Sequence, residues 1–209
     1  MKILAFDTSS DTLTAGVYDS ETALAEENIP GFTRHSETLA PVIRRLFAVS
    51  GVGLNDLDLI AVGIGPGSFT GLRVGLTTAK MLAFAAQKKI VSIPSLEIIA
   101  ASQGLADGLL AVFLDAKKNR VYLAVYDIRQ QRLSVVQKPA LVSVEKLSSV
   151  LKKLKQKGCR AVSDLRPPQA YQVARIAVGL AAKKKFTPLD TLKPLYLHPK
   201  NCNVTPPPR

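Results

Sequence analysis

The sequence predicts an α/β fold made of two related halves, and three observations lead to this prediction. Two apolar runs of strand length, residues 2–7 and 109–114, each end at an aspartate, Asp7 and Asp115. Each run is followed by further runs at hairpin spacing. A segment with helical periodicity then follows in both halves. Strands that alternate with helices in this way indicate sheets covered by helices.

The first half begins with three strands and then alternates between helices and strands. We expect Ser36 and Ser95 to cap helices, because a serine hydroxyl accepts hydrogen bonds from the free amide groups at a helix N-terminus. Gly51 and Gly53 end the first helix. The predicted strands are residues 2–7, 13–18, 22–28, 58–64 and 90–93, and the predicted helices are residues 36–49, 72–87 and 95–101.

The second half repeats this layout in abbreviated form, although the two halves share no sequence repeat. Its predicted strands are residues 109–114, 121–126, 133–137 and 160–162, and its predicted helices are residues 144–155 and 169–182. Three strands followed by helix, strand, helix, strand and helix, the order of the first half, form the layout of a ribonuclease H-like domain. Two such domains make the actin/hexokinase-like (ASKHA) architecture. We therefore expect one domain over residues 1–102 and a smaller one, with a basic C-terminal tail, over residues 103–209.

The composition indicates a globular protein of the cytosol. Hydrophobic residues make up 47% of the 209 residues and charged residues 21%, and no apolar run has the length of a membrane span. The apolar start at residues 1–6 is too short for a signal peptide, so we expect a cytoplasmic location. Cys159 and Cys202 lack metal-ligand spacing, and His35 and His198 lie far apart. We therefore expect no metal site, and we expect His35 to lie at a helix start.

The net charge of +12 is concentrated towards the C-terminus. Residues 1–150 contain 15 Lys and Arg against 14 Asp and Glu, whereas residues 151–209 contain 13 against 2. A basic segment of this kind indicates a polyanionic partner, because Lys and Arg side chains displace the counterions of phosphates. The same lysines can equally be solvated residues on exposed helix faces. The composition leaves both interpretations open.

A glycine-rich segment, residues 63–73, follows a predicted strand and opens a predicted helix. Backbone N–H groups at a helix N-terminus favour anions, and glycines let a ligand approach, so Gly67 and Ser68 are candidate anion contacts. The segment lacks the Lys-Ser/Thr pair of a P-loop and the spacing of a dinucleotide site. A tight turn, capped by Ser68 or Thr70 and allowing close helix packing, is the alternative.

The helix predicted over residues 72–87 is apolar on more than one face. Its own sheet covers one face, and we expect the face with Gly75, Ala79 and Ala83 to form a close crossing with a helix of another subunit. The alternative is that its own domain covers every apolar face.

The two aspartates at the first-strand ends are candidates for holding Mg²⁺ and ATP, as aspartates do in kinases of this architecture. The glycine-rich pattern of such kinases follows neither of them, because the chain reads Asp-Thr-Ser in one case and Asp-Ala-Lys in the other. An autonomous ATP-dependent phosphotransferase is therefore an alternative function only. The candidate nucleotide or anion contacts are Asp7, Thr8, Ser9, Gly67, Ser68 and Asp115.

These residues resemble the TsaB (YeaZ) family of bacterial threonylcarbamoyladenosine biosynthesis, which is related to the glycoprotease superfamily. The segment Gly-Pro-Gly-Ser-Phe-Thr-Gly-Leu-Arg-Val-Gly at residues 65–75 is highly specific. The other matching stretches are residues 3–9, 35–41, 115–116 with 121–122, and 194–197. They follow one another in order over nearly the whole chain. The family usually has more chain in the second domain than residues 162–168 provide here.

The resemblance implies a non-catalytic scaffold subunit that helps to place threonylcarbamoyl on the adenosine beside the anticodon of tRNAs that read ANN codons. The implied partners are the catalytic paralogue TsaD, as a heterodimer, and the ATPase TsaE, as a ternary complex. TsaD binds a metal through a His-x-x-x-His pair, and Ser95 and Ile99 stand at those positions here. The resemblance therefore implies no metal and no cofactor in this chain.

Two helices, residues 36–49 and 72–87, would form a bundle with the same helices of TsaD. The implied partner-binding residues are His35, Leu39, Val42, Ile43, Leu46, Leu72, Arg73, Gly75, Leu76, Ala79, Met81 and Ala83. A homodimer through the same helices, when TsaD is absent, and a tRNA contact through the basic C-terminal quarter remain open. A metalloprotease, which the superfamily's name suggests, is disfavoured because the histidine pair is replaced.

Overall fold

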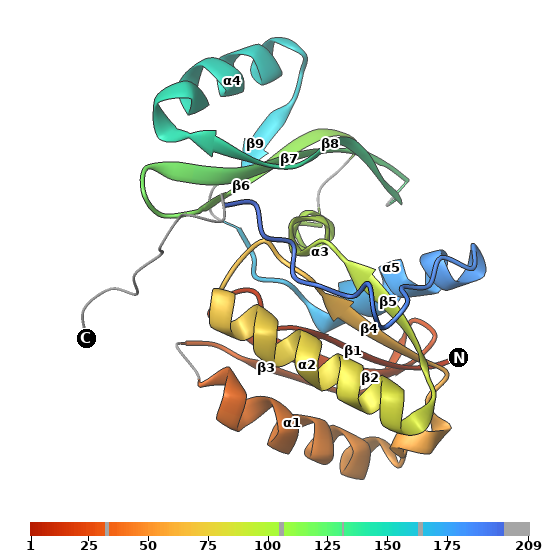
Figure 1. Cartoon of the computed structure of the whole chain (residues 1–209). Helices are drawn as coiled ribbons and strands as arrows, with labels where there is room; N and C mark the ends of the chain where they lie inside the picture. Colours follow the sequence, from red (N-terminus) through yellow and green to blue (C-terminus); the bar gives the residue numbers. More distant parts are fainter. Residues whose placement is uncertain (32–33, 105–106, 131, 163–164, 199–209) are drawn as a thin grey trace. The chain divides into compact units, whose positions relative to one another are not determined.

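The computed structural model describes residues 1–31, 34–104, 107–130, 132–162 and 165–198 (Figure 1). The chain forms two compact units. Unit 1 contains residues 1–104 and 166–195, and unit 2 contains residues 105–165 and 196–209. The expected basic tail falls largely on residues 199–209, which lie outside the described residues.

Unit 1 is built on a five-stranded sheet in the order β3-β2-β1-β4-β5. Strands β1 (Lys2–Asp7), β2 (Leu13–Asp19) and β3 (Thr22–Ile29) form an antiparallel meander. Strand β4 (Leu59–Gly63) pairs parallel with β1, and β5 (Lys89–Ile93) pairs parallel with β4. All five strands lie where the apolar runs of the sequence predict them, within two residues at each end.

Helices cover both faces of this sheet, because successive strand residues point to opposite sides. On one face, Leu4 and Phe6 of β1 pack in one core cluster with residues of α1 (His35–Ser50) and α2 (Phe69–Ala86). On the other face, Ile3 and Ala5 pack in a second cluster with α5 (Ala170–Ala182). Figure 1 shows α1 and α2 side by side along the sheet. The short helices η1 (Leu54–Asp56) and α3 (Ser95–Ser102) complete the unit.

Unit 2 contains a four-stranded sheet in the order β8-β7-β6-β9. Its strands are β6 (Gly108–Asp115), β7 (Arg120–Arg129), β8 (Arg132–Ser143) and β9 (Arg160–Val162). The first three are antiparallel, and β9 pairs parallel with β6. Helix α4 (Val144–Gln156) packs Val150 and Leu154 against Ala111 and Leu123 of the sheet. This order repeats β3-β2-β1-β4 of unit 1 without a fifth strand, as the abbreviated second half predicts.

The division of the chain into units differs from the predicted one, which placed a single boundary between residues 102 and 103. Residues 166–195, which the sequence assigns to the second half, belong to unit 1. The reason is that Ala170, Val173, Ala174 and Ala177 of α5 bury the face of the first sheet that α1 and α2 leave open. Without this helix, that face would expose its apolar side chains to water.

Two of the predicted helix caps are wrong. Arg34 precedes α1 and Pro94 precedes α3, and neither helix has a side-chain cap. Ser36 and Ser95 instead lie inside the first turn of these helices. The expected cap by Ser68 is confirmed, because its hydroxyl accepts a hydrogen bond from the amide of Gly71 at 3.2 Å.

Candidate functional site

Asp7, the first candidate nucleotide contact, is completely buried at the end of β1. One carboxylate oxygen accepts hydrogen bonds from the backbone N–H and the hydroxyl of Ser9, at 2.7 and 2.6 Å. The other accepts a hydrogen bond from the hydroxyl of Ser95 at 2.6 Å. Burial raises the pKa of Asp7, and the hydrogen bonds act in the opposite direction. The carboxylate is thus an internal hydrogen-bond acceptor of unit 1, and the nucleotide contact expected at Asp7 stays a prediction.

The glycines of the candidate anion site face the turn that follows β1. A Cβ atom added to Gly67, Gly71 or Gly75 would lie 2.2, 2.0 or 2.3 Å from atoms of residues 8–9. The amide of Ser68 donates a hydrogen bond to the carbonyl of Ser9 at 2.7 Å. Residues 8–9 therefore fill the space in front of these glycines. The tight turn, the second interpretation of this segment, is the one that the structure has.

Asp115, the aspartate of the second half, lies on the surface of unit 2. Its carboxylate accepts a hydrogen bond from the backbone N–H of Lys117 at 2.7 Å and forms an ion pair with the ammonium of that residue at 2.9 Å. These contacts lower the pKa of Asp115. Its carboxylate is thus paired with a lysine of its own turn.

Most of the predicted partner-binding residues are buried inside unit 1. This group comprises His35, Leu39, Val42, Ile43, Leu46, Leu72, Gly75, Leu76, Ala79 and Ala83. The ring nitrogen Nε2 of His35 lies 2.9 Å from the carbonyl oxygen of Ser10, and the side chains of Leu39 and Leu72 belong to the core cluster of the first sheet. The small-residue face of α2 therefore packs against its own domain, and only Arg73 and Met81 of the predicted set are exposed.

The exposed side of α2 carries large apolar side chains. The exposed fractions are 52% for Phe69, 67% for Met81 and 78% for Phe84. Arg73 lies over the ring of Phe69, with its guanidinium carbon 3.9 Å from the ring centroid. At 100° per residue these positions, with Thr77, fall on one side of the helix. We call Phe69, Arg73, Thr77, Met81 and Phe84 the α2 outer face.

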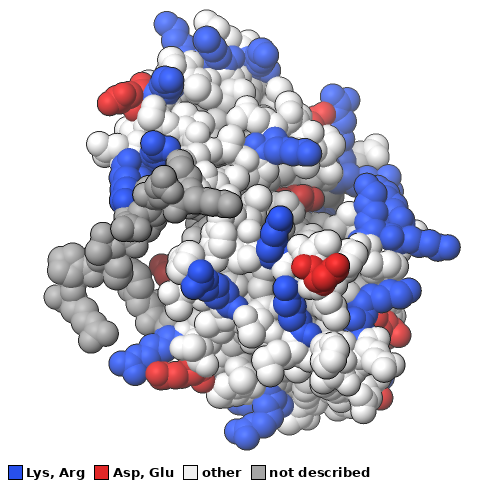
Figure 2. Space-filling view, in the orientation of Figure 1, with Lys and Arg blue, Asp and Glu red and all other residues white. Residues whose placement is uncertain are grey.

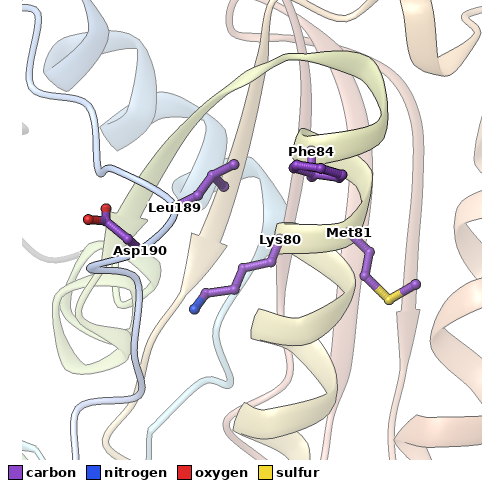
Figure 3. Close-up of a pocket in the computed structure, with 5 residues that line it drawn as sticks. All are labelled: Lys80, Met81, Phe84, Leu189 and Asp190. Carbon is purple, nitrogen blue, oxygen red and sulfur yellow. The ribbon is translucent and has the colours of Figure 1, made fainter.

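A pocket of about 350 Å³ adjoins the α2 outer face (Figure 3). Lys80, Met81 and Phe84 of α2 form one wall, and Leu189 and Asp190 of the segment after α5 form the other. The sequence identified Met81 alone among these residues. Phe84 was recognisable as an apolar residue of the helix, but no local pattern indicates that the segment around Leu189 returns to α2.

Helix α3 contains Ser95 and Ile99, the two positions compared above with a metal-binding histidine pair. Ser95 connects two segments here, because its hydroxyl donates to Asp7 and accepts a hydrogen bond from the amide of Gly65 at 2.9 Å. Ile99 is buried. Burial also raises the pKa of Glu97 on this helix.

Within the described ranges, no three His, Cys, Asp or Glu side chains cluster as metal ligands would. The helices among these residues all fall short of the length and apolarity needed to cross a bilayer.

The two sheets and their helices define an α/β protein of the ribonuclease H-like, actin/hexokinase-like class. The structure titled YeaZ from Pseudomonas aeruginosa superposes with a TM-score of 0.81 at 23% identity, over 94% of this chain and 99% of that one. This similarity shows the fold. The family model of TsaD, the tRNA N6-adenosine threonylcarbamoyltransferase, matches residues 31–191.

Sequence relatives identify the family more closely. The tRNA threonylcarbamoyladenosine biosynthesis protein TsaB of Haemophilus influenzae is 30% identical over 194 residues, which are 90% of this chain and 76% of that protein. The Bacillus subtilis protein of the same name is 36% identical over 136 residues, 65% of this chain. The matched stretch spans 59% of the length of the Bacillus subtilis protein. The chain belongs to the TsaB/YeaZ family, which is related to the TsaD family.

Proposed function

We propose that this chain is a non-catalytic subunit required to form the threonylcarbamoyl group on the adenosine beside the tRNA anticodon. It pairs with the catalytic paralogue TsaD through the α2 outer face, supported by α1, and the pair is joined by the ATPase TsaE. Membership of the TsaB/YeaZ family supports the pathway. The α2 outer face supports the pairing and is the observation that carries the proposal.

The physical reason is the apolar area that α2 leaves in water. Large exposed apolar patches on a soluble domain usually mark protein contacts, and Phe, Met and Arg are enriched at the centres of interfaces. Burying the exposed parts of the Met81 and Phe84 side chains contributes at most roughly 1.5–3 kcal/mol each. Val49 of α1, which is 76% exposed, adds a further apolar side chain on the neighbouring helix. The helix pair is the same one that the resemblance implies, but of the predicted partner-binding residues only Arg73 and Met81 belong to the α2 outer face.

The state of Asp7 supports a non-catalytic role. An ATP-dependent phosphotransferase of this architecture needs the first-strand aspartate beside its metal and phosphates. Here both oxygens of that carboxylate accept hydrogen bonds from the chain itself, in a fully buried position. The phosphotransferase alternative depended on Asp7 and Asp115, and the hydrogen bonds of the buried Asp7 carboxylate disfavour it.

The test is the double variant Met81→Glu/Phe84→Glu. A carboxylate buried without a partner at an interface costs several kcal/mol, enough to abolish a micromolar association of about −8 kcal/mol. We expect calorimetry with TsaD to show at least a 100-fold loss of affinity, and an assay with TsaD, TsaE and the activated donor to show lost tRNA modification. The circular dichroism spectrum should be unchanged.

The matched control is Val136→Glu on β8 of unit 2, which changes an exposed valine, 57% accessible, outside the α2 outer face. This variant should bind TsaD normally. Normal binding by the double variant would contradict the proposed interface, and robust modification by this chain without TsaD would contradict the non-catalytic role.

A further inference from the structure

The positive charge that the sequence concentrates in residues 151–209 is divided between the two units of the structure. The lysines of the basic C-terminal quarter divide between the units, since Lys183–Lys185 follow α5 in unit 1 and those of α4 lie in unit 2. Residues 105–165 of unit 2 contain 12 Lys and Arg against 5 Asp and Glu. Figure 2 shows Lys and Arg side chains at the top of the view, where α4 lies in Figure 1, and also over the rest of the visible face.

Helix α4 presents its lysines to water because its apolar side is fixed against the sheet. Val150 and Leu154 pack on the core of unit 2, and five lysines of or beside the helix are exposed. They are Lys146, Lys152, Lys153, Lys155 and Lys157. None of the five forms an ion pair with a described carboxylate. The ammonium groups of these five lysines are therefore not paired with a carboxylate within the described part of the chain.

Three of these residues form a line along one flank of the helix. At 100° per residue, Lys146, Lys153 and Lys157 fall within about 40° of one another around the axis. At 1.5 Å per residue the line is about 16 Å long. We call these three residues the α4 lysine stripe. A nucleic-acid strand carries one phosphate every few Å of its axis, so a stripe of this length faces several successive phosphates.

The helix dipole does not account for the whole stripe. Lysines near a helix C-terminus compensate the partial negative charge of the free carbonyl groups, and this explains Lys153 and Lys157 in part. Lys146 lies in the first turn, where a cation is unfavourable. Lys183–Lys185 differ, because all three follow the C-terminus of α5. There, their positive charges offset the partial negative charge of the free carbonyl groups.

We infer that the α4 lysine stripe binds the phosphate backbone of RNA, and that it does so without reading base sequence. Helix α4 carries no aromatic side chain on which a base could stack. Lysine acts as a point charge on phosphates, and such contacts position a nucleic acid without specifying its sequence. The choice of RNA over an acidic protein rests on the proposed function, which brings tRNA to the complex.

The experiment measures binding of a tRNA transcript to the full chain without TsaD, by fluorescence anisotropy between about 50 and 200 mM salt. The variant is Lys146→Glu/Lys153→Glu/Lys157→Glu. We expect at least a tenfold loss of affinity and a plot of log K against log salt that is shallower by about 2–3. Transcripts of unrelated sequence should lose affinity equally.

The matched control, Lys183→Glu/Lys184→Glu/Lys185→Glu, changes the net charge by the same amount in unit 1. It should retain most of the affinity. Equal losses in both variants would show a general charge effect and overturn the inference, as would unchanged RNA binding by the stripe variant. A neutral variant, Lys146→Gln/Lys153→Gln/Lys157→Gln, excludes misfolding as the cause. TsaD binding, measured separately, should be normal in all three, so that failure here is distinct from failure of the proposed pairing.

Discussion

The hydroxyl of Ser95 joins segments that are 30 and 88 residues away in sequence, because it accepts from the amide of Gly65 and donates to Asp7. The sequence predicted a helix cap at this position, since serine beside a helix start most often caps it. The hydroxyl is instead used for tertiary contacts, which no local pattern records. At the scale of the residue, the sequence indicated that the hydroxyl of Ser95 forms hydrogen bonds near a helix start, but it did not indicate their partners.

We expect Ser95→Ala to lower the free energy of unfolding by about 2–5 kcal/mol, because it leaves a buried carboxylate oxygen and a buried amide without partners. Urea unfolding followed by circular dichroism measures the change. Ser102→Ala is the control on the same helix, since its buried hydroxyl only donates to the carbonyl of Ile98 at 2.8 Å. It should cost about 1 kcal/mol. Equal small losses would show that the hydrogen bonds of Ser95 are dispensable.

Helix α2 shows what periodicity can and cannot determine about an element. Its apolar residues predicted a helix that is covered on more than one side, and the structure confirms a helix of 18 residues. The sequence could not tell which side faces the sheet. The side with Gly75, Ala79 and Ala83 packs inward because its small residues allow close contact with residue Thr8 and the sheet. The large residues Met81 and Phe84 remain outside.

We therefore expect Ala79→Arg to disrupt the fold itself. Ala79 is completely buried, and a guanidinium group placed there has neither space nor a counterion. Circular dichroism and size-exclusion chromatography should show loss of the native state. Thr77→Arg, at an exposed position of the same helix, should change the free energy of unfolding by no more than about 0.5 kcal/mol. A folded Ala79→Arg protein that fails to bind TsaD would instead restore the small-residue face as the interface.

For the whole molecule, the chain leaves unit 1 and later returns to complete it. The chain leaves unit 1 after residue 104 and returns at residue 166. These two points lie next to each other, as shown by the side-chain amide of Gln103, which exchanges hydrogen bonds with the backbone of Arg166 at 3.3 Å. The order of strands and helices predicted both sheets, including the shorter second one. It did not predict that α5 packs on the first sheet, because a helix after β9 can cover either sheet with the same apolar side.

This arrangement predicts how fragments behave. Residues 1–104 alone should not fold, because Ile3, Ala5 and Val91 lose the cover that α5 provides. A chain that joins residue 104 to residue 166 through a short Gly-Ser linker, and ends at residue 195, should fold as unit 1. Circular dichroism and amide dispersion in NMR spectra distinguish the two outcomes. Independent folding of residues 1–104 would support the boundary predicted from the sequence.

The sequence by itself indicated most strands and helices, the α/β layout with two sheets and the family, because these depend on local periodicity and on a specific glycine-rich segment. Only the tertiary structure decided which residues are exposed. Asp7, Ser95 and Ala79 have residue types that suit a site, a cap and an interface, yet all three are buried in contacts with distant segments. Burial is a property of packing between elements, so a pattern read along one element leaves it undetermined.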